Sequence, residues 1–408
     1  MSKKRVVITG LGIIAPIGSD TNSFWNAAVK GTNGIRPIQS FDISDFRTKV
    51  GGEVLDFDPA QYIGADQLKF MGRSSQFAVA ASQMALAESG LAVDRENPYR
   101  IGVAMGTTMG EPQVLEKGIQ TKYDTGDPNQ IPSGLPRQYP CGVIPSNIAA
   151  HFNTAGPVIM IPTACAAGNY ALGYAYDLIC LDEADVVIAG GSDPISKIAF
   201  TGFNRLLATA KEVCRPFDKN RDGMAVGEGA GILIVEELEH ALKRGAEIYA
   251  EILGYGLGCD AFKMTIPDPT GSGGIRALNK ALRNAGISSD EIDYICAHGT
   301  GTGENDKSET LIIKETLGKR AYDVPISSLK SMCGHTMGAA SAIEAAACIM
   351  TLKHNVILPT INYSEPDPDC DLDYVPNEAR EKEVDTVVSN AYAFGGNTSS
   401  IIFRKFKG

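Results

Sequence analysis

The sequence has no excess of positive charge, and this shortage excludes a large class of partners. Its 408 residues contain 37 lysines and arginines against 48 aspartates and glutamates, which gives a formal net charge of -11. Proteins that bind nucleic acid usually present a basic field over one face. We therefore expect no nucleic-acid partner, and an acidic protein partner would need a local basic patch.

Long hydrophobic runs are missing as well. No stretch of 18 consecutive apolar residues occurs, so we expect no membrane span. The basic residues at the start precede an apolar stretch and could suggest a secretory signal. Glycines and Pro16 interrupt that stretch, so a strand that ends in a turn explains it better.

The cysteines lack the short spacings of metal sites. There are nine, an odd number, and no two of them form a CxxC pair. Such a pattern favours reduced thiols over a disulfide framework, and we expect a cytoplasmic protein.

What the chain does contain is typical of an α/β protein. Hydrophobic residues make up 44% and charged residues 21%, enough apolar material for a large core. Short β-branched runs alternate with longer stretches rich in alanine and leucine, which predicts strands alternating with helices. The clearest runs are Arg5–Thr9, Ile101–Met105, Asp185–Ala189 and Gly231–Val235.

The order of motifs suggests an internal duplication. In each half a strand ends in Gly-Thr, at Thr107 and at Thr300, and a later strand leads into a helix of small residues. We predict an N-terminal half at 1–253 and a C-terminal half at 254–408. This comparison places Cys165 and His335 at corresponding strand-to-helix junctions, where both could face one pocket.

A glycine motif near the start resembles a dinucleotide-binding loop but is incomplete. Gly10-Leu-Gly12 follows a strand, yet the acidic residue needed about 20 residues later is missing. We therefore predict no nucleotide, and no other organic cofactor.

Cys165 is the best candidate for a nucleophile. It follows an apolar strand and begins a helix of small residues, where the helix dipole and nearby cations can lower a thiol pKa. Thiolate is the nucleophilic form. A buried structural thiol is the alternative for this cysteine alone.

Two histidines lie at similar junctions in the second half. His298 ends a strand and precedes a glycine–threonine loop, while His335 follows Lys330 in a second motif. Lys330 could add positive potential, or could form an ion pair with Asp306 or Glu309, which we favour. One cysteine and two histidines on three such junctions form a far more specific pattern than any of them alone.

Together these residues resemble the β-ketoacyl-acyl-carrier-protein synthases, most closely the type II elongating enzymes. The resemblance covers nearly the whole chain and rests on the motifs Thr163-Ala-Cys165-Ala, His298-Gly-Thr, Lys330 to Ala340, Phe394-Gly-Gly and Arg215 to Gly231. It implies a thiolase-like α/β fold, with two duplicated halves in a five-layered αβαβα arrangement, and a homodimer. It also implies a condensation in which an acyl group on Cys165 reacts with a malonyl thioester on acyl carrier protein.

The resemblance also implies roles for individual residues. Backbone N–H groups of Cys165 and Phe394 would hold the oxyanion, and Phe394 would act as a gate. Thr300 and Thr302 match positions that hold the pantetheine arm. Lys330 and Glu309 match a supporting ion pair, with Asp306 beside them.

Other positions matter for ion binding and carrier docking. Glu344, Ser389 and Asn390 match positions that hold a monovalent cation in some relatives, although Cys296 stands where those relatives have asparagine. Otherwise we expect no metal. Cations near the entrance would meet the carrier protein, and Lys69, Arg73 and Arg205 are the candidates.

Several residues depart from the family pattern, and three other functions have to be compared with it. Ala393 replaces a glycine before the gate, the usual Thr-Asn after it reads Asn397-Thr398, and the loop 206–214 is shorter than usual. The changes leave room for a specialised ketosynthase of a polyketide, polyene or unusual-lipid pathway. A non-catalytic chain-length-factor partner would lack Cys165. A thiolase would need a second catalytic cysteine, and 389–403 has none.

Overall fold

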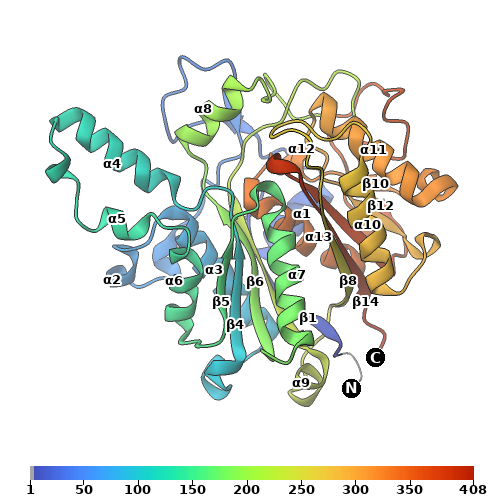
Figure 1. Ribbon diagram of the computed structural model, residues 1–408, viewed down its shortest axis with the longest axis horizontal. Coiled ribbons are helices and arrows are strands. Elements are labelled where there is room, and N and C mark those ends of the chain that lie inside the picture. Colours follow the sequence, from blue (N-terminus) through green and yellow to red (C-terminus); the bar gives the residue numbers. More distant parts are fainter. Residues whose placement is uncertain (1–3) are drawn as a thin grey trace.

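The computed structural model describes residues 4–408, so the first three residues of the predicted N-terminal half lie outside it. One sheet of ten strands runs through the molecule in the order β10-β9-β13-β14-β8-β1-β7-β6-β4-β5 (Figure 1). The strands of the first half are β1 (Val6–Ile14), β4 (Ile101–Gly106), β5 (Val158–Ile161), β6 (Val186–Asp193) and β7 (Gly229–Glu237). Those of the second half are β8 (Ala250–Cys259), β9 (Tyr294–Cys296), β10 (Ile326–Ser327), β13 (Thr386–Tyr392) and β14 (Asn397–Lys405).

The two halves repeat one topology. In the first, β5, β4 and β6 run parallel, and β7 pairs antiparallel with both β6 and β1. In the second, β10, β9 and β13 run parallel, and β14 pairs antiparallel with both β13 and β8. The predicted duplication is therefore present in the strand order itself.

A short antiparallel contact joins the two half-sheets. Val6–Ile8 of β1 pairs with Ala250–Ile252 of β8, so hydrogen bonding continues from one half into the other. The paired residues of both strands are buried, except Glu251, which is partly exposed.

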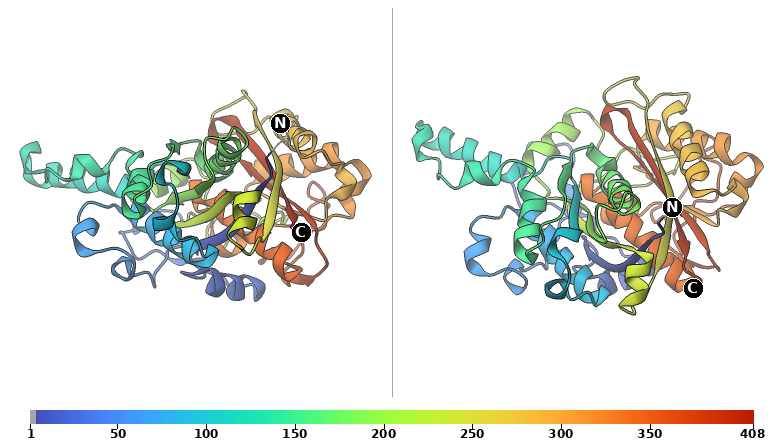
Figure 2. Two further views of the ribbon diagram at one scale, coloured as in Figure 1. Left: turned by 90° about the horizontal axis from the view of Figure 1, so that it is seen from below. Right: turned by 60° about the horizontal axis from the view of Figure 1, so that its bottom comes forward.

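Helices complete the five predicted layers. Helices α3 (Arg73–Ser89) and α6 (Val143–Phe152) cover the outer face of the first half, and α10 (Ser272–Ala285) and α11 (Gly303–Leu317) cover that of the second. Helices α7 (Ala167–Cys180) and α13 (Ala340–His354) lie between the two half-sheets (Figure 2). A helix buried on every side should be apolar all round. Helix α13 follows this rule closely: its residues from Ala340 to Leu352 are all buried, and the polar ones among them are Ser341, Glu344 and Thr351.

Glycines in β1 permit close packing against α3. A Cβ atom at Gly10 would lie 2.2 Å from the carbonyl oxygen of Ala85, and one at Gly12 would lie 1.9 Å from that of Ala81. These glycines therefore serve strand–helix contact, which explains the incomplete dinucleotide motif.

The region around 123–142 projects from the body, as expected for a surface excursion. Helices α4 (Pro112–Thr125) and α5 (Leu135–Gln138) form an arm at one side of the molecule (Figure 1). The remaining elements are α1 (Thr21–Val29), α2 (Ala65–Leu68), α8 (Lys197–Arg205), α9 (Leu238–Lys243), α12 (Lys330–Cys333), β2 (Arg36–Pro37), β3 (Val50–Gly51), β11 (Val356–Ile357) and β12 (Arg380–Glu381). Among residues 4–408, no helix has the length and apolar character needed to cross a membrane.

Candidate active site

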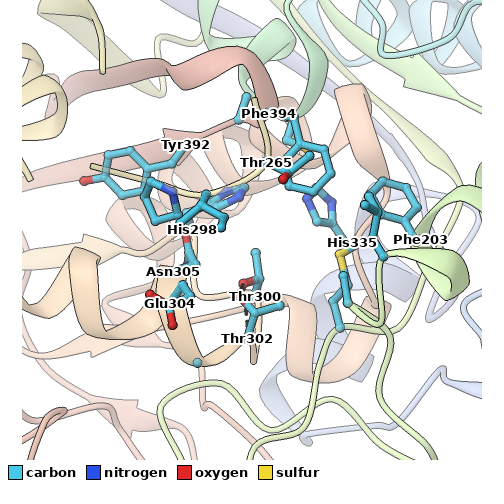
Figure 3. Close-up of a pocket in the computed structure, with 18 of the residues that line it drawn as sticks. Phe203, Thr265, His298, Thr300, Thr302, Glu304, Asn305, His335, Tyr392 and Phe394 are labelled. Atoms are coloured by element: carbon cyan, nitrogen blue, oxygen red, sulfur yellow. Dashed lines mark hydrogen bonds between the residues drawn. The ribbon is translucent and has the colours of Figure 1, made fainter. Parts of the chain in front are cut away.

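A cavity of about 480 Å³ lies where the two halves meet, and it contains the three predicted reactive side chains. Cys165 enters it from the first half, while His298 and His335 enter from the second. The two imidazole centres are 5.3 Å apart and the rings are nearly perpendicular (Figure 3). The fold thus brings together residues that are far apart in the sequence.

A strained turn presents Cys165 to the cavity. Strand β5 ends at Ile161, and a single turn of 3-10 helix, Ala164–Ala166, leads into α7. Ala164 has a φ of 52°, a left-handed conformation that costs energy for a residue other than glycine. The strain turns the next side chain, Cys165, toward the second half, and Cys165 is 5% exposed.

The environment of the thiol differs from the sequence prediction. Burial raises the pKa of Cys165 to about 12, although the Lys330 ammonium and the N–H groups of Phe394 and Cys165 act in the opposite direction. The carboxylate of Asp193 also raises this pKa. Cys165 is therefore a thiol at neutral pH, because desolvation outweighs the nearby positive charge.

Lys330 and Glu309 hold His298 in place. Lys330 Nζ donates to its carbonyl oxygen at 2.7 Å and lies 3.3 Å from its Nδ1. Glu309 accepts hydrogen bonds from the backbone N–H groups of His298 and Gly299 at 2.9 and 2.8 Å. Because Nδ1 faces an ammonium donor, the ring proton lies on Nε2.

His335 reaches the same protonation state by a different contact. Its Nδ1 accepts the backbone N–H of Met337 at 3.1 Å, so its proton also lies on Nε2. Burial, then the charge of Lys330, lowers the pKa of both His298 and His335 well below the usual value. Both imidazoles are therefore neutral and can each donate one Nε2–H.

The predicted partner of Lys330 is wrong. Its ammonium forms an ion pair with Glu344, one helix turn into α13, and among residues 4–408 it makes no ion pair with Asp306 or Glu309. Glu309 is engaged by backbone N–H groups instead, and burial raises its pKa to about 8. The side chains of Lys330 and Glu344 are both almost completely buried, so each compensates the charge of the other.

Asp306 and the two threonines shape the loop after β9. Asp306 accepts the N–H groups of Thr300 and Gly301 at 3.0 and 3.1 Å, which fixes the loop from inside. The hydroxyls of Thr300 and Thr302 lie 2.8 Å apart and both residues line the cavity. Both threonines therefore lie on the wall of the cavity that also contains Cys165.

The gate segment keeps the glycines that its backbone needs. Gly395 and Gly396 have φ values of 82° and 80°, which favour glycine. Ala393 has φ -138° and ψ 156°, an extended conformation open to any residue. Ala393, at a position where the family resemblance predicts glycine, therefore adopts its backbone conformation without strain. The Phe394 ring packs 5.8 Å from that of Phe203.

Only part of the candidate cation set lies together. Alternation along β13 places Ser389 and Asn390 on opposite faces of the sheet, and Asn390 pairs with Ser400 across the strands. Glu344 Oε2 and Ser389 Oγ are buried without a partner on the inner side, as is Asn169 Oδ1. The side chain of Asn390 thus cannot join them.

The predicted docking cations differ in their availability. Arg73 makes a bidentate ion pair with the buried carboxylate of Glu228, so it holds the fold. Lys69 pairs with Asp66 on the surface. Arg205 ends α8 and is exposed near the mouth of the cavity.

The residue of the second half that is equivalent to Cys165 differs from the predicted one, His335. The 3-10 turn Met337–Ala339 precedes α13 as Ala164–Ala166 precedes α7, and Met337 has a φ of 54° like that of Ala164. The counterpart of Cys165 is therefore Gly338, three residues after His335. Helix α12 lies between β10 and this turn and has no equivalent after β5, which displaces the match.

Sequence reasoning missed one wall of the cavity and one buried acid. The loop after β8 supplies Lys263, Met264 and Ile266 to the lining, but it carries no motif. Asp193 lies at the end of β6 and accepts four hydrogen bonds beside Cys165. Its only sequence signal is an acid at the end of an otherwise apolar strand.

The chain is similar to known proteins over its full length. Residues 3–241 match the family model "Beta-ketoacyl synthase, N-terminal domain", and residues 249–364 match "Beta-ketoacyl synthase, C-terminal domain". A 3-oxoacyl-[acyl-carrier-protein] synthase 2 from Synechocystis is 42% identical, and the alignment covers 100% of this chain and 99% of that protein.

Solved structures agree in fold. The ishigamide ketosynthase/chain length factor is 41% identical with a TM-score of 0.96, and the match covers 100% of both chains. A structure of a type II polyketide synthase acyl-carrier protein in complex with its ketosynthase gives 34% identity and a TM-score of 0.93, again over 100% of both chains.

Proposed function

Because this chain belongs to the β-ketoacyl synthase family, it is an acyltransferase that makes β-ketoacyl thioesters, and we propose that Cys165, His298 and His335 carry out the reaction. The reaction is a decarboxylative condensation of an acyl group with malonyl-acyl carrier protein. The product is a β-ketoacyl thioester two carbons longer.

The first step transfers the acyl group to Cys165. The sulfur attacks the thioester carbonyl, and the oxyanion accepts the N–H groups of Cys165 and Phe394, which already face the thiol. When the tetrahedral intermediate collapses, the carbon–sulfur bond to the carrier arm breaks. The thiol proton leaves with that sulfur, so no separate base has to hold it.

The second step generates a carbon nucleophile. The malonyl thioester oxygen accepts Nε2–H from His298 and from His335, and these donors stabilise the enolate formed as carbon dioxide leaves. The enolate carbon attacks the acyl-cysteine carbonyl, and the Cys165–acyl bond breaks. Water then restores the proton on the thiolate.

One observation carries this mechanism. Both ring Nδ1 atoms are engaged, by Lys330 and by the N–H of Met337, so both Nε2–H groups are free to donate in the cavity that holds the thiol. Neutral imidazoles are also the form that low polarity favours.

Labelling of the nucleophile tests the assignment. The protein is incubated with an acyl thioester of acyl carrier protein and digested, and we expect one acyl mass on the peptide that contains Cys165. Cys165→Ala should gain none, while the control Cys259→Ala, which removes an exposed thiol near the cavity, should load normally. An acyl group on any other cysteine contradicts the proposal.

Acyl carrier protein is the partner that delivers both substrates. The likeness to a ketosynthase solved with its acyl-carrier protein supports this partner. Thr300 and Thr302 are the residues that would hold the phosphopantetheine arm, and exposed Arg205 would meet the acidic carrier. The presence of Cys165 argues against a non-catalytic chain-length factor, which would lack this cysteine.

A specialised ketosynthase is the second candidate function. Two of the similar structures are named for ishigamide and for a type II polyketide synthase, which supports this reading. The cavity mouth is bordered by Leu206 and Leu207 of the short loop after α8. A panel of acyl-carrier thioesters of graded length and unsaturation separates the two, because an elongating enzyme should accept saturated chains best.

A homodimer in the cytoplasm is our proposal for the assembly. Strand β5 ends the ten-stranded sheet, and one of its long sides carries unpaired backbone groups that a second copy could pair. Val158 of this strand is 42% exposed. A mass near twice 43.3 kDa in light scattering would support the dimer, and a monomer would refute it. Among residues 4–408 no cysteine forms a disulfide, and this favours a reducing compartment.

Unpartnered buried oxygens favour the candidate site for a monovalent cation near Glu344. Glu344 Oε2, Ser389 Oγ and Asn169 Oδ1 lack partners, and oxygen ligands are what such ions take. A bound cation would neutralise the part of the Glu344 charge that Lys330 leaves and so keep both side chains in place.

A further inference from the structure

Asp193 occupies a position in the first half that corresponds to the gate residue of the second. Val103 and Cys296 are equivalent, because each lies three residues before the glycine of a Gly-Thr pair. Their partners on the neighbouring strands, Ile188 and Ser389, are therefore equivalent too. Five residues after these partners come Asp193 in the first half and Phe394 in the second.

The second half therefore contains a counterpart of the oxyanion site. At the site of Cys165, the N–H groups of Cys165 and Phe394 face the thiol. At the equivalent site of the internal duplication, the turn residue is Gly338, and its N–H donates to the side chain of Asp193 with an N···O distance of 2.6 Å. A carboxylate of the chain itself fills the place where an oxyanion would form.

The carboxylate is held by three further donors. Thr107 Oγ1 and Thr108 N lie 2.7 Å from its oxygens, and Met109 N lies at 3.2 Å. Asp193 is fully buried, and Gly338 has no room for a side chain, because a Cβ there would lie 2.6 Å from Asp193 Oδ2. The fit is specific to an anion with several acceptor sites.

The contacts of Asp193 tie three segments together around the nucleophile. The Thr107–Met109 turn follows β4, whose last residue, Gly106, packs directly on Ala167 at the start of α7. Gly338 belongs to the 3-10 turn that packs on the turn bearing Cys165. Movement of Asp193 would therefore shift the sulfur relative to both histidines.

We propose that Asp193 is a positioning residue for the condensation: an internal anion that locks the Thr107–Met109 turn and Gly338 around Cys165. This inference rests on the proposed role of Cys165 as nucleophile. The charged groups that face Cys165 are Lys330 and Asp193, while His298 and His335 are neutral. Glu111 is the further acid that lies near Asp193.

Asp193→Asn tests the proposal because it separates charge from position. Removing the negative charge should move the pH profile of Cys165 alkylation by iodoacetamide about one unit lower, roughly tenfold faster at a fixed pH. The asparagine amide has only one acceptor oxygen, so some of the four donors around Asp193 would face its NH₂ group instead. The Thr107–Met109 turn should therefore loosen. Acyl loading of Cys165 should then fall by about 10²-fold, the cost of a displacement near 1 Å.

Glu111→Gln is the matched control. Glu111 is also a fully buried carboxylate, and it accepts hydrogen bonds from Ser74 and Ser75 without a contact to the Cys165 turn. We expect both alkylation and loading in this variant to stay within a few-fold of the wild type. Equal behaviour of the two variants would overturn the proposal, as would a change of alkylation and loading in the same direction.

Thr107→Val keeps the test open if Asp193→Asn does not fold. It removes one donor and retains the anion, so loading should fall several-fold at an unchanged alkylation rate. Unchanged loading would refute the positioning role. Failure of the wild type to load Cys165 at all would instead refute the proposed function, and the alkylation result would still test the effect of the Asp193 charge.

Discussion

Replacing His335 tests the central claim that two neutral imidazoles stabilise the enolate. His335→Ala removes one Nε2–H from a site where the side chain is 2% exposed, so the lost hydrogen bond acts in a medium of low polarity. The loss of one such donor costs about 2.7–4 kcal/mol of transition-state stabilisation, or about 10²–10³ in rate. Release of carbon dioxide from malonyl-acyl carrier protein should fall by that factor.

Acyl loading should respond much less to the same change. The oxyanion of the loading step is held by the backbone at Cys165 and Phe394, and neither N–H comes from His335. We expect loading to fall less than tenfold, partly because the N–H of Met337 loses its acceptor. Carbon dioxide release is followed with a labelled malonyl group and loading by intact mass, both in single-turnover experiments.

Two variants serve as controls for this experiment. His335→Gln returns an N–H donor to the same position and should recover part of the lost decarboxylation. His151→Ala removes a histidine that contacts Gln67 on the surface and should change neither step. Equal losses in both steps, or a glutamine variant no better than alanine, would refute the reasoning and make His335 structural.

Three further outcomes follow from the same contacts. Because burial raises the pKa of Cys165 to about 12, its alkylation rate should keep rising with pH beyond pH 10. Lys330→Met should slow the alkylation of Cys165 at each pH, because the Lys330 ammonium lowers the pKa of this thiol. Mass mapping of the alkylated peptide over time measures both effects. Arg73→Ala should destabilise the fold by about 3 kcal/mol, seen as a lower urea midpoint, because Glu228 is left buried and unpaired, while affinity for acyl carrier protein stays unchanged. Ala393→Gly should lower the urea midpoint by the equivalent of about 0.5 kcal/mol and leave turnover unchanged, since the residue is extended.

Much of the site was predictable because it lies at strand ends. Cys165 and His298 lie just after strands, while His335 lies just after the short helix α12, and the structure places all three in one cavity. The fold followed from the same alternation, together with the order of Gly-Thr junctions. The local sequence pattern thus predicts where strands end, and in a parallel sheet this also predicts which residues lie near the site.

Side-chain partners were harder to predict, for physical reasons. The family resemblance pairs Lys330 with Glu309, but its ammonium forms an ion pair with Glu344, whose side chain is buried with it. The register of the duplication was missed because α12 is inserted in the second half only. The thiol pKa was misjudged because a sequence shows the helix dipole but hides the degree of desolvation.

The short pairing of β1 with β8 limits how the molecule can admit its substrates. Since one hydrogen-bonded sheet crosses the seam and α7 and α13 are wedged between its two parts, a hinged, shell-like opening would break buried strand contacts. Entry must therefore depend on the loops above the seam. There, the N–H of Gly395 donates to the carbonyl of Met264 at 2.8 Å, so the segments after β13 and β8 have to rearrange in concert while the scaffold beneath them remains a rigid body.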